Sequence, residues 1–187
     1  MKHLYLCRHG ETAWTLSSQH TSTTDIELTE RGAAQAKKLR TRMEKVPLDA
    51  VFTSPLRRAR DTCQNPKARI DPNLVEWGYG DYEGLTTQEI QAKHPQWNLF
   101  QNGAPHGESV RDVRKRADAF LKRIRAYEGN VAVFSHGHFM RVLAARYLGL
   151  KVEKGQMFTL SVASLSILGS EHDHPAILLW NDTDHLV

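Results

Sequence analysis

The chain has 187 residues, of which 40% are hydrophobic and 25% are charged, as in an ordinary globular protein whose single domain would span residues 1–187. Its net charge of +4 is compatible with acidic ligands such as phosphates but too small to indicate a nucleic-acid partner. No apolar run is long enough to span a membrane, and no charged-then-apolar leader precedes Leu4. We therefore expect a cytoplasmic protein with no membrane partner.

Cysteine usage agrees with a reducing compartment. Cys7 and Cys63 are the only cysteines, too few for a disulfide framework. Cys7 falls in an apolar stretch, where we expect it to be a small buried residue.

The chain begins with a strand pattern followed by a helix pattern. Residues 3–8 predict a strand, with Leu4 and Leu6 on one side. Residues 28–46 predict a helix that Thr29 caps. Its apolar positions should face the core, and they are Ala36, Leu39, Met43 and Val46.

The middle of the chain continues this alternation. Residues 49–54 predict a second strand, and residues 56–64 predict a helix that begins after Pro55. Residues 68–75 contain a short third strand, and a further helix follows from Thr87.

The densest basic stretch of the chain has a helical pattern that begins at Ser109, a good N-cap. Its apolar residues recur at helical spacing at Val110, Val113, Ala117, Phe120, Leu121 and Ile124. The basic residues lie off that stripe, and they are Arg111, Arg114, Lys115, Lys122 and Arg125. A solvated helix face is therefore predicted, in preference to a nucleic-acid surface.

The C-terminal part predicts a buried strand over residues 130–136, then a helix over 139–150. Inward positions of that helix are Phe139, Val142, Leu143 and Tyr147. Residues 162–169 and 176–181 predict two more strands, joined as a hairpin around the polar residues 170–175. The whole pattern predicts an α/β fold, a three-layer sandwich with a central, mainly parallel sheet flanked by helices.

Polar residues stand where the predicted strands end. They are Arg8 and His9 after the first strand, Ser54 and Arg58 after the second, Glu76 after the third, and Ser135 and His136 after the fourth. Open α/β sheets bind ligands at the carboxyl ends of their strands, so we expect these residues to converge on one cleft.

Two arginines, two histidines and a carboxylate in one cleft suggest phosphate chemistry. Arginine binds phosphate oxygens bidentately and keeps its charge at any relevant pH. Histidine can attack phosphorus as a neutral imidazole, and a carboxylic acid can protonate a leaving oxygen and then activate water. Such a set supplies positioning and charge neutralisation without a metal ion or another cofactor.

Four segments in order resemble the histidine phosphatase superfamily, the phosphoglycerate mutase-like group. They are "LCRHGETAW" (residues 6–14), "SPLRRARDT" (54–62), "EWGYGDYEG" (76–84) and "FSHGH" (134–138). Each follows a predicted strand, and the resemblance covers essentially the whole chain. The family's central sheet between helices agrees with the fold predicted from the pattern.

The resemblance implies a role for each of five residues. His9 would be the nucleophile that becomes phosphohistidine, and Arg8 and Arg58, rather than Arg57, would hold the phosphate. His136 would stabilise the transition state, helped by the Gly137 N–H at a helix start. Glu76 would be the general acid and then the base for water.

Alternatives remain for some of these roles. Asp81 and Glu83 could replace Glu76 as the acid on composition alone. Arg60 and Arg141 are expected to be salt-bridged or exposed rather than catalytic.

Candidate substrate-binding residues are Thr15, Thr21, Ser22, Tyr79 and Gly137. Thr15 stands where the family often has Asn, and Ser22 where Gly is common, so substrate contacts are carried over less safely there. Trp77 is a further candidate beside Tyr79, with aromatic packing as the alternative. In the loop over residues 102–109, His106 and Glu108 could contact substrate, but exposure or helix capping is the favoured interpretation.

Only 60 residues separate Glu76 from His136, which looks short for the lid of a mutase. A mutase must exclude water from its phosphoenzyme, so a short covering segment favours hydrolysis. We expect a phosphomonoesterase, in the branch that includes sedoheptulose bisphosphatase-like and broad acid phosphatases. Its ligand would be a small phosphorylated metabolite, a sugar phosphate or bisphosphate above all, or inorganic phosphate. A phosphoglycerate mutase, a ribazole or phosphohistidine phosphatase, and a non-catalytic phosphate-binding regulatory module remain alternatives.

Two rival sites are disfavoured. Residues Cys63 to Arg69 have the C-x5-R spacing of cysteine phosphatases, but they lack a glycine-rich interior and Pro66 removes one N–H donor. The pairs His136/His138 and His172/His174 have no third metal ligand at recognisable spacing, so no metal site is predicted.

Overall fold

The computed structural model describes residues 1–187, in which six strands form one sheet in the order β3-β2-β4-β1-β5-β6. They are β1 (Leu4–Arg8), β2 (Ala50–Thr53), β3 (Arg69–Ile70), β4 (Val131–Ser135), β5 (Leu165–Glu171) and β6 (His174–Asp182). Strands β1 to β4 pair in parallel, whereas β5 and β6 pair antiparallel. The predicted mainly parallel sheet is therefore confirmed.

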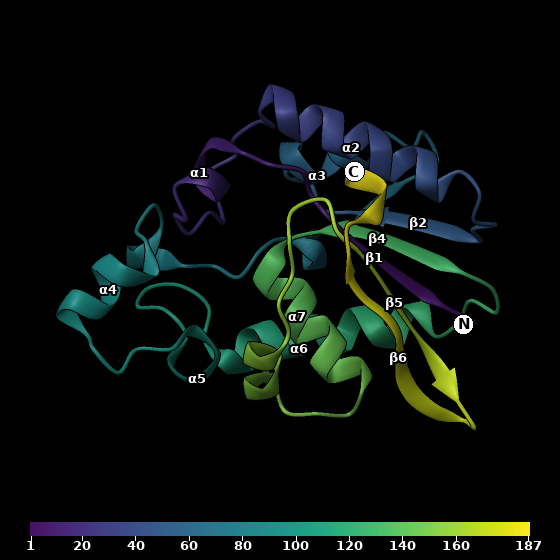
Figure 1. Ribbon diagram of the computed structural model, residues 1–187. Coiled ribbons are helices and arrows are strands. Elements are labelled where there is room, and N and C mark those ends of the chain that lie inside the picture. The colour runs from purple at the N-terminus through teal and green to yellow at the C-terminus, as the bar shows by residue number, and fades with distance from the viewer.

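Helices cover both faces of this sheet. On one face lie α2 (Glu30–Met43) and α3 (Arg57–Cys63), and on the other lie α6 (Val110–Ile124) and α7 (Gly137–Tyr147) (Figure 1). The short helices α1 (Ala13–Leu16), α4 (Thr87–Lys93) and α5 (Leu99–Asn102) lie beyond the carboxyl ends of the parallel strands. The three-layer α/β sandwich agrees with the predicted fold class.

Alternate residues of the central strands enter two hydrophobic cores, as the period of a strand requires. Leu4 and Leu6 belong to a cluster of 26 buried residues on the side of α6 and α7. Cys7 enters a cluster of 9 buried residues on the side of α2 and α3, together with Cys63. Both cysteines are buried free thiols.

Local sequence signals explain where the two longest helices begin. The Thr29 side chain accepts a hydrogen bond from the Gly32 N–H at 2.9 Å and so caps α2. Ser109 caps α6, and Asp112 completes a capping box with it. Such caps satisfy N–H groups that the first turn of a helix leaves free, so both helices begin where the sequence predicts.

Two predicted inward residues are only half buried. Helix α2 ends at Met43 instead of reaching Val46, because the residue before Pro47 is disfavoured in a helix. Val46 still packs against the smaller core. Tyr147 lies at the end of α7, where its hydroxyl donates a hydrogen bond to the Gly169 carbonyl at 3.0 Å.

The third strand is shorter than expected. Only Arg69 and Ile70 pair with β2, and both are exposed at the sheet edge. Pro72, which has no N–H for a strand ladder, then starts the 3₁₀-helix Pro72–Leu74 that Asp71 caps. Glu76 therefore follows a turn rather than a strand.

The predicted hairpin is present, but its strands extend into the polar segment. Strands β5 and β6 pair up to Glu171 and His174, which leaves a two-residue turn. His172 and Asp173 occupy this turn with φ of 45° and 66°, as in the tight turns that suit strand twist.

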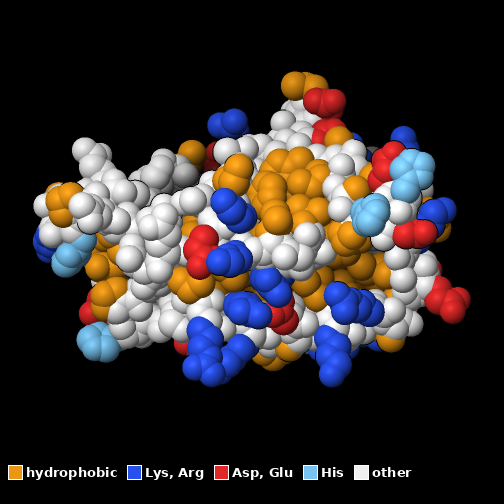
Figure 2. Space-filling view, turned by 90° about the horizontal axis from the view of Figure 1, so that it is seen from below, with side chains coloured by type: hydrophobic (Ala, Val, Ile, Leu, Met, Phe, Trp, Pro, Cys, Tyr) orange, Lys and Arg blue, Asp and Glu red, His pale blue; other side chains and the backbone are white.

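The basic residues of α6 lie on a solvated face, as predicted. Lys and Arg side chains gather on the side of the molecule seen from below, beneath α6 and α7 (Figure 2). Carboxylates are interspersed with them, and Arg114 pairs with Asp118 at 3.3 Å. The exposed set is Arg111, Arg114, Lys115, Lys122 and Arg125. No helix in the structure has both the length and the apolar character that a membrane span requires.

The loop after β1 packs tightly against the first turn of α2. A Cβ on Gly10 would lie 2.4 Å from the Gly32 carbonyl oxygen, and a Cβ on Gly32 would lie 2.1 Å from the Glu11 carbonyl oxygen. Only glycine permits this approach, which fixes the segment that carries His9.

Candidate active site

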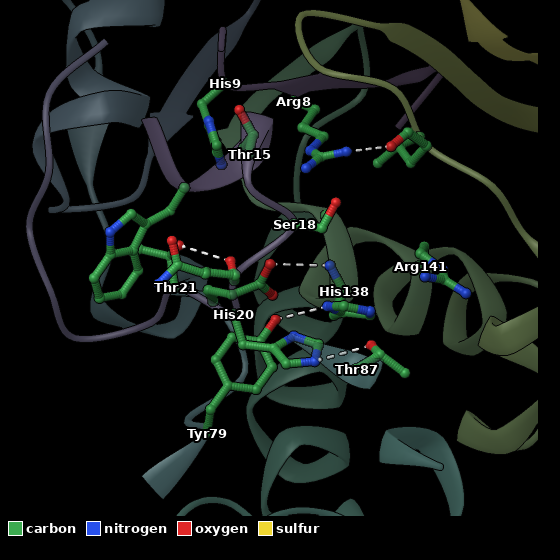
Figure 3. A pocket seen from close by; sticks show the side chains of 15 residues that line it. Arg8, His9, Thr15, Ser18, His20, Thr21, Tyr79, Thr87, His138 and Arg141 are labelled. Atoms are coloured by element: carbon green, nitrogen blue, oxygen red, sulfur yellow. Dashed lines mark hydrogen bonds between the residues drawn. The ribbon is translucent and has the colours of Figure 1, made fainter. Parts of the chain in front are cut away.

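A cavity of about 260 Å³ opens at the carboxyl edge of the sheet (Figure 3). Its walls come from the end of β1, the segment over residues 14–21, Tyr79, the start of α4 and the first half of α7. Arg8, His9 and Glu76 line it. The predicted convergence on one cleft is thus observed for Arg8 and His9 at the end of β1 and for Glu76 after its turn. The other predicted members are buried and do not line the cavity, and they are Ser54, Arg58, Ser135 and His136.

His9 is held with one ring nitrogen free. Its Nδ1 lies 2.8 Å from the carbonyl oxygen of Gly10, an acceptor only, so Nδ1 carries the proton. The Gly10 N–H in turn donates to the Thr62 hydroxyl at 3.0 Å. Nε2 is therefore the nitrogen with an available lone pair, on a ring whose orientation the backbone fixes.

His136 lies directly beside His9 and is fully buried. The centroids of the two rings are 5.2 Å apart. His136 Nε2 is 2.8 Å from the Ser54 hydroxyl, which joins the ends of β2 and β4. Gly137, the next residue, begins α7 and lines the cavity, and a Cβ there would lie 3.2 Å from the Arg8 guanidinium.

Arg58 is fully buried at the first turn of α3 and does not itself line the cavity. Its guanidinium donates to three backbone carbonyls of one loop, those of Thr21, Ser22 and Thr24, at 3.1 to 3.2 Å. Glu83 holds the same loop, since its carboxylate accepts from the N–H groups of Ser22 and Thr24 at 2.8 to 3.0 Å. Arg57, by contrast, is exposed and pairs with Glu27 and Asp61.

Glu76 accepts three backbone hydrogen bonds. Oε1 accepts from the N–H groups of Trp77 at 2.9 Å and Phe139 at 2.7 Å, and Oε2 accepts from His138 at 3.0 Å. Two of these donors belong to the first turn of α7, so the carboxyl is fixed at a positive helix end. Asp81 instead pairs with the exposed His106, and the Glu83 carboxylate accepts hydrogen bonds from the loop that contains Ser22. Of the three carboxylates, only Glu76 lines the cavity.

Three polar atoms around His9 are buried and have no hydrogen-bond partner within the protein. They are Nε of Arg8, Nε of Arg58 and Nδ1 of His136. Buried polar groups nearly always have partners. Arg8 lines the cavity, and Arg58 and His136 lie close to His9 without lining it. Three unpaired groups from three separate elements near His9 form an arrangement suited to an anion with several oxygens.

The buried environment keeps both histidines neutral. Burial lowers the pKa of His9 well below its ordinary value, and the positive charges of Arg8 and Arg58 lower it further. Burial, Arg58 and His9 lower the pKa of His136 in the same direction. A neutral His9 is the nucleophilic form at physiological pH.

The family model of the histidine phosphatase superfamily (branch 1) matches residues 4–183. The chain belongs to this superfamily. A curated relative, an acid phosphatase from Mycobacterium tuberculosis, is 37% identical over 97% of this chain and 93% of its own length. A sedoheptulose 1,7-bisphosphatase from Saccharomyces cerevisiae is 34% identical over 80% of this chain and 68% of its own length.

Solved structures agree. The product of an open reading frame from M. tuberculosis matches with a TM-score of 0.93 at 36% identity, covering 96% of this chain and 97% of its own. The chain is therefore a histidine phosphatase, a phosphoric monoester hydrolase by class, and the resemblance seen in the sequence is confirmed.

The predicted substrate-binding residues of this histidine phosphatase are only partly brought to the cavity. Thr15, Thr21, Tyr79 and Gly137 line it, although Thr15 is tied into the capping box of α1 with Thr12. Ser22 does not line it, and its N–H and hydroxyl are bonded to Glu83. The geometry gives no support to Ser22 as a substrate contact, because its N–H and hydroxyl already donate to the Glu83 carboxylate.

The three other candidates from the sequence do not line the cavity. Trp77 is fully buried in the larger core, edge-to-face with Phe100. Glu108 pairs with Arg116 at 2.6 Å and accepts a hydrogen bond from the Gly78 N–H. His106 is exposed, which agrees with the interpretation favoured from the sequence.

Sequence reasoning missed much of the wall opposite His9. His20, Thr87, His138 and Arg141 line it (Figure 3). Arg60 is exposed as expected, but Arg141 is neither exposed nor paired with a carboxylate, so that expectation was wrong for Arg141. Its place on the cavity side of α7, five residues after His136, was the signal available.

A hydrogen-bonded aromatic cluster supports that wall. The Tyr79 hydroxyl lies 2.6 Å from Nδ1 of His138, and Nε2 of His20 lies 3.2 Å from the Thr87 hydroxyl. The centroids of the His20 and Tyr79 rings are 4.6 Å apart.

The rival cysteine site lies away from this cavity, whereas His138 of the pair His136/His138 lines it. Cys63 is buried in the smaller core at the end of α3, where burial raises the pKa of its thiol to about 11. A protonated thiol is a poor nucleophile. No three His, Cys, Asp or Glu residues gather in a group that could hold a metal ion.

Burial of His20 makes stability depend on pH. Burial lowers its pKa to about 4, whereas an unfolded histidine has a pKa of about 6.5. The unfolded state therefore takes up a proton first as pH falls. We expect about 3 kcal/mol of stability, present above pH ~6.5, to be lost between pH ~6.5 and pH ~4 through His20 alone.

Urea unfolding at pH 7 and at pH 4.5 measures this loss. The variant His20→Gln should lose about 2 to 3 kcal/mol less than the wild type over that interval, because glutamine does not titrate. The exposed His94→Gln is the control and should behave like the wild type. Equal losses in wild type and His20→Gln would contradict the assignment.

Proposed function

We propose that this histidine phosphatase is a metal-independent phosphomonoesterase that hydrolyses small phosphorylated metabolites through a phosphohistidine on His9. The three buried unpaired atoms, on Arg8, Arg58 and His136, carry the proposal. All three can donate, provided that the Ser54 hydroxyl donates to Nε2 of His136 and so leaves the ring proton on Nδ1. Three donors around the free Nε2 of His9 would hold a phosphoryl group for attack.

In the first step, Nε2 of His9 attacks phosphorus and the bond to the leaving oxygen breaks. Arg8 and Arg58 neutralise the charge on the phosphoryl oxygens, and the neutral His136 ring donates a hydrogen bond to one of them. The Glu76 carboxyl gives its proton to the leaving oxygen, so the alcohol departs neutral. The products are phospho-His9 and a Glu76 carboxylate.

In the second step, water attacks the phosphoryl group of phospho-His9. The Glu76 carboxylate takes a proton from that water, the nitrogen–phosphorus bond breaks, and inorganic phosphate forms. Nε2 regains its lone pair and Glu76 its proton, so the enzyme returns to its starting state.

A sugar phosphate or bisphosphate is the proposed substrate class. The cavity of about 260 Å³ suits a small metabolite, and one relative is named for a sugar bisphosphate. We further propose that the whole chain, 1–187, is one histidine phosphatase domain, because the family match spans nearly all of it. Two buried free thiols favour the cytoplasm in this proposal.

Phosphate release from sugar phosphates, sugar bisphosphates, 3-phosphoglycerate and an aryl phosphate tests the proposal, with a chelator present. We expect chelator-resistant release, and the rank order of kcat/KM will identify the substrate class. Conversion of 3-phosphoglycerate to its isomer without release would instead identify a mutase. Release that the chelator abolishes would contradict the metal-independent mechanism.

A further inference from the structure

One cation in the cavity is not needed for the chemistry at His9. Arg141 lies on α7 and lines the cavity, and no carboxylate pairs with it. The scissile phosphoryl group already has donors from Arg8, Arg58 and His136 in the proposed function. Arg141 is therefore an additional positive charge with which no carboxylate of the protein pairs directly.

Neutral groups hold Arg141 in place. Its Nε donates to the Gly155 carbonyl at 3.1 Å, and one terminal nitrogen donates to the Gln156 carbonyl at 3.0 Å. The guanidinium carbon lies 4.6 Å from the centroid of the Phe100 ring, on which it stacks. These contacts orient the guanidinium but give it no direct carboxylate partner, and they leave its other terminal nitrogen free to donate.

The electrostatic surroundings favour an anion beside Arg141. Glu76 is the only acidic residue among those that line the cavity, and three backbone N–H groups already bind it. Burial lowers the pKa of Arg141, which reflects the cost of a partly desolvated cation. An incoming anion would offset that cost.

There is also space for a substrate that reaches Arg141. A second cavity, of about 270 Å³, shares four lining residues with the first: His20, Thr87, His138 and Arg141. Arg141 thus stands where the two cavities meet. Figure 3 shows it across the catalytic cavity from His9. The remaining wall of the second cavity carries amide and apolar side chains, with no acidic residue.

We propose that Arg141 binds a second anionic group of the substrate, a carboxylate or a second phosphate, while the scissile phosphate lies at His9. This inference rests on the proposed function and narrows it. The preferred substrates are then phosphomonoesters that carry a second negative charge, and neutral phosphorylated alcohols are poorer substrates.

Matched substrate pairs separate this role from a structural one. Glycerol 3-phosphate and 3-phosphoglycerate differ in the carboxylate, and fructose 6-phosphate and fructose 1,6-bisphosphate differ in the second phosphate. The variant Arg141→Gln should lower kcat/KM for the member with the second anion by about 10- to 100-fold, the usual effect of a charged hydrogen bond. For the other member, kcat/KM should stay within about threefold.

Control variants keep the test decisive. Arg146→Gln, on the same helix but paired with Asp118 at 2.7 Å, should leave the ratio within each pair unchanged. If Arg141→Gln does not fold, Arg141→Met, whose chain can still pack on Phe100, takes its place. Equal loss on both members of a pair, or no loss on either, would overturn the inference while leaving the proposed function intact. Absence of release from every compound by the wild type would overturn both.

Discussion

Replacing His9 by alanine should lower the rate of phosphate release by at least ~10⁴-fold, because the variant has no atom that can accept the phosphoryl group. The Gly10 carbonyl accepts from the His9 ring, and the Gly10 N–H donates to the Thr62 hydroxyl. The second of these bonds does not involve the His9 side chain, so the fold should persist in His9→Ala. Stopped assays of phosphate release from the best substrate, with matched thermal unfolding curves, measure both quantities.

The matched control is His106→Ala, an exposed histidine that pairs only with Asp81. Its rate should equal that of the wild type. Binding of inorganic phosphate to His9→Ala should still be measurable, since Arg8, Arg58 and His136 remain. A rate in His9→Ala within tenfold of the wild type would mean that another group is the nucleophile.

Arg58→Met should lower kcat/KM by ~10³-fold, the scale seen for an arginine that neutralises charge in phosphoryl transfer. Two causes act together. The variant loses one of the three buried donors around the phosphoryl site, and it releases the carbonyls of Thr21, Ser22 and Thr24. We also expect a lower melting temperature, because three carbonyls lose their charged donor.

The neighbouring arginine gives the control for Arg58. Arg57→Met removes an exposed side chain with surface ion pairs to Glu27 and Asp61, which are worth little. Its kcat/KM and melting temperature should match those of the wild type. Equal losses of kcat/KM and melting temperature in the two variants would contradict this role of the Arg58 guanidinium. They would mean that any change in the first turn of α3 impairs the enzyme.

The sheet and the convergence of its strand ends were predictable because they depend on short-range patterns. Apolar alternation in β1 and the buried run of β4 identify strands, and the topology of parallel sheets then places Arg8, His9 and His136 at one edge. The resemblance supplied the choice of Glu76 over Asp81 and Glu83. No local pattern could show that Glu83 holds the loop whose carbonyls bind Arg58.

The wall opposite His9 was not predictable for a physical reason. His20 lies in a loop and Thr87 at the start of α4, and they meet only because residues 19 and 20 pair with the segment just before that helix. Arg141 looked like a surface arginine because its partners are backbone carbonyls and a ring, which no residue pattern reveals. Contacts of this kind depend on tertiary packing, which residue spacing does not encode.

A direct test of the central claim is to trap the phosphoenzyme. The wild-type enzyme would be mixed with its best substrate, quenched in alkali within the first turnover, and digested for mass spectrometry. We predict one phosphoryl group on the peptide that contains His9, stable to alkali and lost in acid, as a phosphorus–nitrogen bond requires. A phosphoryl group on any other residue, or rapid phosphate release with no phosphopeptide at any time, would contradict the phosphohistidine mechanism.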